Sequence, residues 1–267
     1  MAEPMDLLEQ RIGALRAEVR RTVMAGDRAR AKRLRAELRA VEAEWDVAIL
    51  AITGHDPGED LEAKAPTASL LPVREQVHQV LTFLTVPAAP KMIVALHAAL
   101  FAGALTGTQL TSLRRDEANS FKAAPYGRPY YLCAVLTADH LSPARGLLAV
   151  STWPLAERIA GPLSQRVHFL TAAVRLAEHL SQSDLATLPA QRLLWEFASN
   201  IPGGARSFGT MKPNIVQRAA LAELQVHHDA DLSHREAAAR RALNQLDDSQ
   251  QMFGVALKLA TATTKGQ

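Results

Sequence analysis

The fold of this chain is decided by residues 106–154, which read TGTQLTSLRRDEANSFKAAPYGRPYYLCAVLTADHLSPARGLLAVSTWP. The first part, from about Gln109 to Lys122, places apolar residues at the spacing of an α-helix, in which successive residues are turned by about 100°. One face of this helix carries Leu110, Leu113 and Phe121, and the opposite face carries Ser112, Arg115, Asn119 and Lys122. We therefore predict an amphipathic helix with a packed apolar face and an exposed polar face.

The polar face of this helix has side chains that suit nucleic acid. Arginine and lysine neutralise phosphates, and arginine and asparagine form paired hydrogen bonds with base edges in the major groove. Asp116 lies close to the same face, where its carboxylate would repel a phosphate backbone. Arg114 and Glu117 flank the apolar face and are three residues apart, so we expect them to pair with each other.

A β-hairpin is predicted after this helix. Residues 130–136 form an apolar and aromatic run that is typical of a strand, and residues 147–151 form a second one. The polar segment 137–146 between them predicts a turn, with Arg145 close to its tip. After the second strand, Trp153 and Pro154 indicate the start of another helix.

Helices are also predicted on both sides of this stretch. Residues 73–86 and 91–102 carry apolar residues at helical spacing, and the proline-containing segment 86–90 separates them. The region 162–267 has further helical stripes. The sequence therefore predicts a mainly α fold with a small β-hairpin.

The order of two packed helices, a turn, a polar-faced third helix and a hairpin resembles the winged helix-turn-helix domain. The resemblance covers about residues 73–160 and rests on layout. It implies that the third helix enters the major groove of double-stranded DNA while the hairpin, or wing, contacts the flanking backbone. The residues it assigns to DNA contact are Ser112, Arg115, Asn119, Lys122, Arg128 and Arg145.

A second interpretation belongs to another functional class. A winged-helix fold does not dictate function, so the same layout is compatible with a helical adaptor that binds protein. An enzyme is not expected, because the sequence contains no recognisable nucleophile and base pair, nucleotide loop or metal-ligand spacing. No cofactor is expected either.

The amino-terminal residues predict a helical hairpin. Residues 5–52 carry two coiled-coil-like apolar seams, and Gly26 and Asp27 between them suit a helix end and a helix start. Because a lone two-helix hairpin buries little apolar surface, its seam needs another surface to pack on. We expect it to form a homodimer; the alternative is that the hairpin folds back onto its own chain. The predicted domains are the hairpin (1–53), a linker (54–71), a winged-helix domain (72–161) and a helical region (162–267).

Charge and composition restrict the possible partners. The net charge is only +3, from 30 basic and 27 acidic residues, so any DNA-binding surface must be local. The single cysteine, Cys133, excludes an internal disulfide, and it lies in a predicted strand. No apolar run is long enough to span a membrane, and the first residues lack a secretory pattern, which predicts a soluble cytoplasmic protein.

One histidine-rich segment has the residue types of a metal site. It contains His227, His228, Asp229, Asp231 and His234, but their spacing matches no familiar metal-binding motif. A structural role is favoured, because Ser233 to Glu236 fits a capping box that would begin a new helix. No metal site is therefore predicted.

Overall fold

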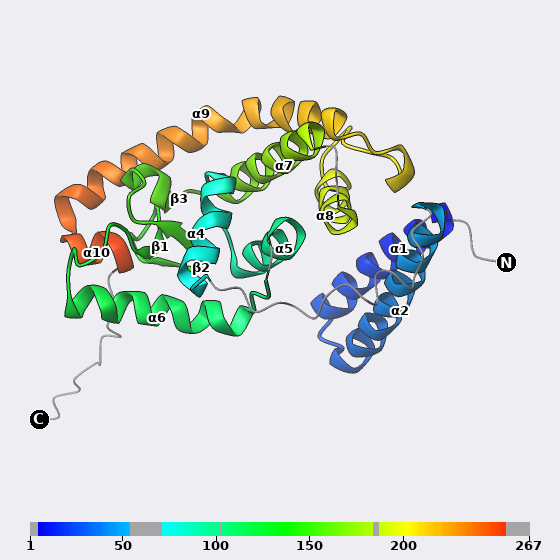
Figure 1. Ribbon diagram of the computed structural model, residues 1–267, viewed down its shortest axis with the longest axis horizontal. Helices are drawn as coiled ribbons and strands as arrows, with labels where there is room; N and C mark the ends of the chain where they lie inside the picture. Colours follow the sequence, from blue (N-terminus) through cyan, green and yellow to red (C-terminus); the bar gives the residue numbers. More distant parts are fainter. Residues whose placement is uncertain (1–4, 54–70, 102, 184–186, 255–267) are drawn as a thin grey trace, which may run out of the picture. The chain divides into compact units, whose positions relative to one another are not determined.

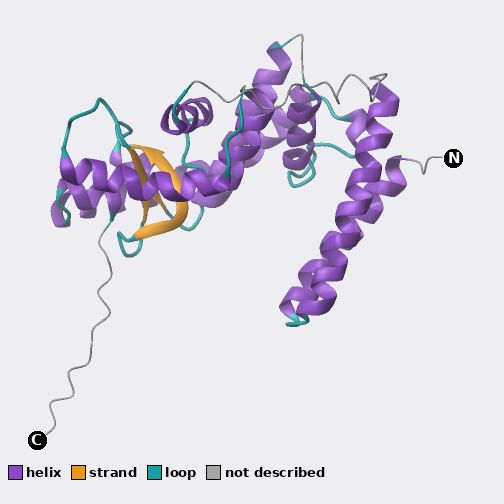
Figure 2. Cartoon of the chain, turned by 60° about the horizontal axis from the view of Figure 1, so that its bottom comes forward, coloured by secondary structure: helices purple, strands orange, loops and turns teal. Residues whose placement is uncertain are grey.

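The computed structural model describes residues 5–53, 71–101, 103–183 and 187–254. Figure 1 shows the order of the elements, and Figure 2 shows that helices dominate and that one small sheet is present. The predicted fold class, mainly α with a small β part, is confirmed. The chain divides into two compact units, residues 1–65 and 66–267. Apart from Leu71, the predicted linker lies outside the described residues.

The first unit is the predicted helical hairpin, formed by α1 (Met5–Met24) and α2 (Arg28–Thr53). Gly26, between the helices, has a φ of +77°, which favours glycine. The Asp27 Oδ1 atom accepts a hydrogen bond from the Arg30 backbone nitrogen at 3.0 Å, so Asp27 caps α2. Several hairpin arginines pair with carboxylates of the other helix, among them Arg16 with Glu42 at 2.9 Å.

From Leu71 onward, the described part of the second unit has three helices, then a small sheet and further helices (Figure 1). The elements are α4 (Val73–Leu84), α5 (Pro90–Leu100), α6 (Gly107–Ala123), β1 (Leu132–Thr137), β2 (Pro143–Val150), the 3-10 helix η1 (Leu155–Arg158), β3 (Ile159–Ala160), α7 (Ser164–Gln182), α8 (Leu188–Ala198), the 3-10 helix η2 (Phe208–Thr210), α9 (Pro213–Gln245) and α10 (Asp248–Phe253).

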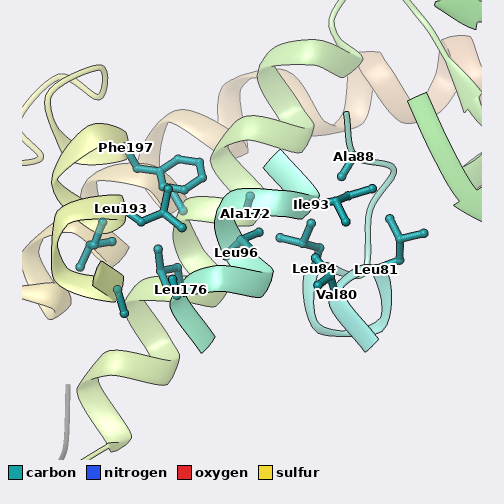
Figure 3. Packing of buried hydrophobic residues seen from close by; sticks show 14 of the residues in the cluster. Val80, Leu81, Leu84, Ala88, Ile93, Leu96, Ala172, Leu176, Leu193 and Phe197 are labelled. Carbon is teal, nitrogen blue, oxygen red and sulfur yellow. The ribbon is translucent and has the colours of Figure 1, made fainter. Parts of the chain in front are cut away.

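The main hydrophobic core of the second unit takes buried side chains from α4, α5, α6, α7, α8 and α9. Figure 3 shows part of this core as a row of side chains, from Phe197 of α8 through Leu176 of α7 to Ile93 of α5 and to Leu84 and Leu81 of α4. All five side chains are almost completely buried. Helices from both predicted segments, 72–161 and 162–267, therefore contribute to one core, which holds α4 and α5 in place beside α6.

The sheet has the strand order β2-β1-β3. β1 pairs with β2 in antiparallel orientation and with β3 in parallel orientation. β3 was not predicted, because the segment after Trp153 was expected to be a helix. The segment after Trp153 forms only the short 3-10 helix η1. The chain then becomes extended, and Ile159 of β3 pairs with Leu136 of β1 in the buried sheet.

The predicted helix start at Ser233 is wrong, because α9 continues through this residue from Pro213 to Gln245. Packing explains the difference. The buried Asp231 side chain accepts hydrogen bonds from Ser164 Oγ at 2.5 Å and from Arg235 Nε at 2.8 Å. Arg235 also donates to the Ala156 carbonyl at 2.9 Å. These contacts with α7 and η1 need a continuous helix across residues 231–235.

Candidate nucleic-acid interface

The α6 helix begins with a complete capping box. The Thr106 side chain accepts a hydrogen bond from the Gln109 backbone nitrogen at 3.4 Å, and the Gln109 side chain accepts one from the Thr106 nitrogen at 2.8 Å. These contacts satisfy two backbone donors that a helix start leaves open. The Thr-x-x-Gln spacing was present in the sequence and would have placed the helix start at Gly107 rather than near Gln109.

The two faces of α6 are separated as the sequence predicts. Leu110, Leu113 and Phe121 are buried. The four residues predicted to face outward, Ser112, Arg115, Asn119 and Lys122, are all exposed. Lys122 and Asn119 form no side-chain hydrogen bond or ion pair with the described part of the chain. The outward face therefore offers polar groups that are available to a partner.

Two residues on this face are partly engaged. The Ser112 hydroxyl donates to the Gln109 carbonyl of its own helix at 3.0 Å. The Arg115 guanidinium lies 4.0 Å from the Asp116 carboxylate, and both side chains are mostly exposed. An exposed pair of this kind contributes little, so it does not prevent Arg115 from contacting a phosphate or a base.

The expected pair between Arg114 and Glu117 is wrong. Glu117 is completely buried, and its Oε1 atom accepts hydrogen bonds from Arg74 Nε at 2.6 Å and from Arg128 Nη1 at 3.0 Å. Its Oε2 atom accepts a hydrogen bond from the Leu132 backbone nitrogen at 2.8 Å. This carboxylate therefore connects α4, α6 and the first residue of β1. No local sequence signal identifies Arg74 as its partner, because 43 residues separate the two.

Arg128 lies inside the protein rather than with the exposed residues of α6. Besides its contact with Glu117, its guanidinium lies 4.0 Å from the centre of the Tyr131 ring. Only 21% of its side chain is exposed. Of the six residues that the sequence assigned to DNA contact, Arg128 is thus the one whose charge is already matched by a buried carboxylate.

Next to Arg128, the Tyr130 hydroxyl group donates to the Glu75 carboxylate, and the Tyr130 ring stacks on His78 with 4.2 Å between ring centres. Burial, followed by the hydrogen bond to Glu75, raises the pKa of Tyr130. This tyrosine is therefore a neutral structural donor. It ties the segment before β1 to α4.

Arg145 lies in a bulge of β2 and not at the hairpin tip where the sequence placed it. The strand pairs Ala134 with Leu148 and Leu136 with Pro143, so β2 advances five residues while β1 advances two. Gly146 in this bulge has a φ of +71°. Arg145 beside it is exposed and forms no ion pair with the described residues. The bulge therefore presents a free cation from the edge of the sheet.

A short backbone pairing attaches the hairpin to the helices. Ala88, between α4 and α5, forms an antiparallel bridge with Leu148 of β2, with hydrogen bonds of 3.1 and 3.0 Å in the two directions. Since α4, α5 and α6 also pack on one another and on the sheet, the α6 face and the β2 bulge belong to one compact unit. The sequence showed no sign of this bridge.

The other reactive side chains of the chain do not assemble into a site among the described residues. Asp231 is occupied by Ser164 and Arg235, and the His228 ring contacts the exposed carboxylate of Asp229 at 3.1 Å. Within the described ranges, no three histidine, cysteine, aspartate or glutamate side chains come together as metal ligands. Cys133 is fully buried, and burial raises the pKa of its thiol to about 11, so it is a poor nucleophile.

Comparison with protein-family models, with curated proteins and with solved structures finds no match to this chain. Within the described segments, none of the helices combines the length and the apolar character needed to cross a bilayer.

Proposed function

We propose that this protein binds double-stranded DNA through a winged-helix arrangement and acts as a transcriptional regulator. The observation that carries the proposal is the exposed polar face of α6, with Arg115, Asn119 and Lys122, in the same compact unit as the Arg145 bulge. An α-helix fits the major groove of B-DNA, which is about 12 Å wide. In this arrangement α6 enters the groove, and Arg145 contacts the phosphate backbone beside it.

The order of elements supports the same proposal. Three helices are followed by an antiparallel hairpin, and the segment between the first two helices pairs with the second strand through Ala88 and Leu148. A small sheet of this kind holds the hairpin beside the third helix, as a wing requires. Arg128 is left out of the proposed contact set, because its guanidinium serves Glu117.

A gel-shift titration with fragments of the source genome at several salt concentrations tests the proposal. Phosphate contacts release counterions, so affinity should fall steeply as salt rises. Arg115→Ala and Lys122→Ala should each weaken binding and reduce the slope of the salt dependence by about one contact. The matched control is Arg218→Ala, which removes the same charge from an exposed position on α9 and should leave binding unchanged.

Two results would reject this role. If the folded protein binds no DNA at any salt concentration, the adaptor interpretation replaces it. If DNA binding is intact in both α6 variants and circular dichroism shows that they are folded, α6 is not the contact surface. If instead the protein binds DNA and both α6 variants weaken the binding, a selection of bound genomic fragments would identify the preferred sequence. The role requires a location with access to DNA, and we propose the cytoplasm.

We further propose that the hairpin of α1 and α2 mediates homodimerisation. It forms a compact unit of its own, and it leaves Leu7, Val23 and Met24 exposed. Dimeric DNA-binding proteins read two half-sites, so a separate dimerisation unit suits the proposed role. Light scattering should give twice the chain mass for the full protein and the single mass for a chain that starts at Leu71. If the full protein and the shortened chain contain the same number of chains per particle, the hairpin does not mediate dimerisation.

A further inference from the structure

A cavity of about 420 Å³ opens between α6 and the β2 bulge. Its volume lies within the range of pockets that bind small molecules. The α6 helix contributes Leu110, Thr111, Arg114 and Arg115 to its wall, and Leu148 of β2 and Phe253 of α10 close it from other sides. Because Arg115 also belongs to the proposed DNA-binding face, the cavity adjoins that face.

The polar part of this wall is positively charged. Arg114 is half-buried and forms no hydrogen bond or ion pair with the described part of the chain, because its expected partner Glu117 is held by Arg74 and Arg128. Arg115 has only the exposed carboxylate of Asp116 at 4.0 Å. None of the described residues that line the cavity carries a carboxylate. Two guanidinium groups without a buried counterion favour an anionic group, which they can bind through paired hydrogen bonds.

The remaining wall is apolar. Leu110, Leu148 and Phe253 line the cavity, and so does Pro90, the first residue of α5. An occupant that satisfies both parts of the wall needs one acidic group and a compact apolar body.

We propose that this cavity binds an amphipathic organic anion, whose acidic group pairs with Arg114 and Arg115 while its apolar part contacts Leu148 and Phe253. A consequence rests on the proposed function: since Arg115 belongs to both surfaces, the bound anion competes with DNA. Linkage requires the effect to be mutual, so DNA weakens binding of the anion by the same factor.

The first experiment tests the cavity without DNA. The full chain is titrated with 8-anilinonaphthalene-1-sulfonate, an aromatic anion, and in parallel with its uncharged analogue N-phenyl-1-naphthylamine. One saturable site for the anion is expected, with much weaker binding of the analogue. Arg114→Gln with Arg115→Gln should weaken binding of the anion by about tenfold or more. Arg218→Gln with Arg240→Gln, which removes the same two charges from exposed positions on α9, should leave it unchanged.

A second variant blocks the cavity without removing charge. Ala118 also lines it, so Ala118→Phe should fill the space and abolish the saturable site while both arginines remain. Circular dichroism and the melting temperature confirm that each variant is folded. The absence of a saturable site, equal binding of the uncharged analogue, or binding that neither the arginine variants nor Ala118→Phe reduces would overturn the proposal.

The second experiment adds DNA and separates the two proposals. Saturating anion should weaken DNA binding by the wild-type protein and have no effect on the Ala118→Phe variant. Arginine-dependent binding of the anion by a protein that binds no DNA would support the cavity and reject the DNA-binding role. DNA binding that is unchanged by the anion in the wild-type protein would reject the competition.

Discussion

Replacing Glu117 by glutamine is the most direct test of how α6 is held. The substitution preserves the size of the side chain and removes its charge. It leaves the guanidinium groups of Arg74 and Arg128 without the carboxylate that they now contact at 2.6 and 3.0 Å. It also changes the acceptor of the Leu132 nitrogen, which lies 2.8 Å from the other carboxylate oxygen. All three interactions connect α6 to neighbouring elements.

The size of the effect follows from burial. Breaking a buried ion pair by removing one partner costs about 3 to 5 kcal/mol. Glu117 is fully buried, but 32% of the Arg74 side chain and 21% of the Arg128 side chain are exposed, so water partly solvates the arginines after the change. We therefore expect a loss of about 3 kcal/mol in the free energy of unfolding, at the lower end of that range. For a domain of this size, the melting temperature should fall by about 6 to 12 °C.

Urea unfolding followed by circular dichroism measures the loss directly. Glu178→Gln is the matched control, because Glu178 forms an exposed pair with Arg175 at 3.4 Å and its loss should cost below about 1 kcal/mol. Arg114→Gln should also have little effect on stability, since Arg114 is not the partner of Glu117. The reasoning is refuted if Glu117→Gln costs no more than Glu178→Gln, or if Arg114→Gln destabilises the protein as strongly as Glu117→Gln does.

Two further predictions concern pH and backbone strain. Burial lowers the pKa of His168 from 6.5 to about 4. The unfolded chain therefore takes up a proton on this side chain at a higher pH than the folded chain does. The free energy of unfolding should thus fall by up to about 3 kcal/mol as the pH drops from 6.5 toward 4. Urea midpoints at several pH values should show this loss in the wild-type protein and a smaller one in His168→Gln; equal losses in both would contradict it. In the same assay, Gly146→Ala should lower the free energy of unfolding by about 1 kcal/mol, because alanine is disfavoured at a φ of +71°. Gly107→Ala, in open space at the start of α6, is the control and should cause no loss. Equal effects of the two changes would rule out strain in the bulge.

Most helices could be predicted because their signals are local. The hairpin helices, α4, α5 and α6 all show apolar residues at helical spacing, and the exposed side of α6 follows from the same pattern. Their ends differ from the predicted ones by a few residues, since the capping groups and turns that end a helix occupy only one or two positions. The strand β2 begins earlier than predicted, because the bulge around Gly146 hides its alternating pattern.

The candidate site was predicted only in part. Exposure of Arg115, Asn119 and Lys122 depends on the helix alone, so periodicity was sufficient to find it. The burial of Arg128 depends on Glu117, which reaches it only after α6 and the segment before β1 have packed together. The cavity beside Arg114 could not be predicted at all, because its wall combines α6, β2 and α10, which are distant in sequence.

The sequence by itself determined the elements of this protein: the helical hairpin, the amphipathic α6 and the antiparallel hairpin that follows it. Their signals repeat within a few residues, and the apolar positions must face the interior wherever the helix is placed. Only the tertiary structure decided that Glu117 pairs with Arg74 and Arg128, that α9 continues through Ser233, and that Arg114 is left beside a cavity. These outcomes depend on charges far apart in the chain, whose preference for a buried partner can be satisfied only after the core has brought them together.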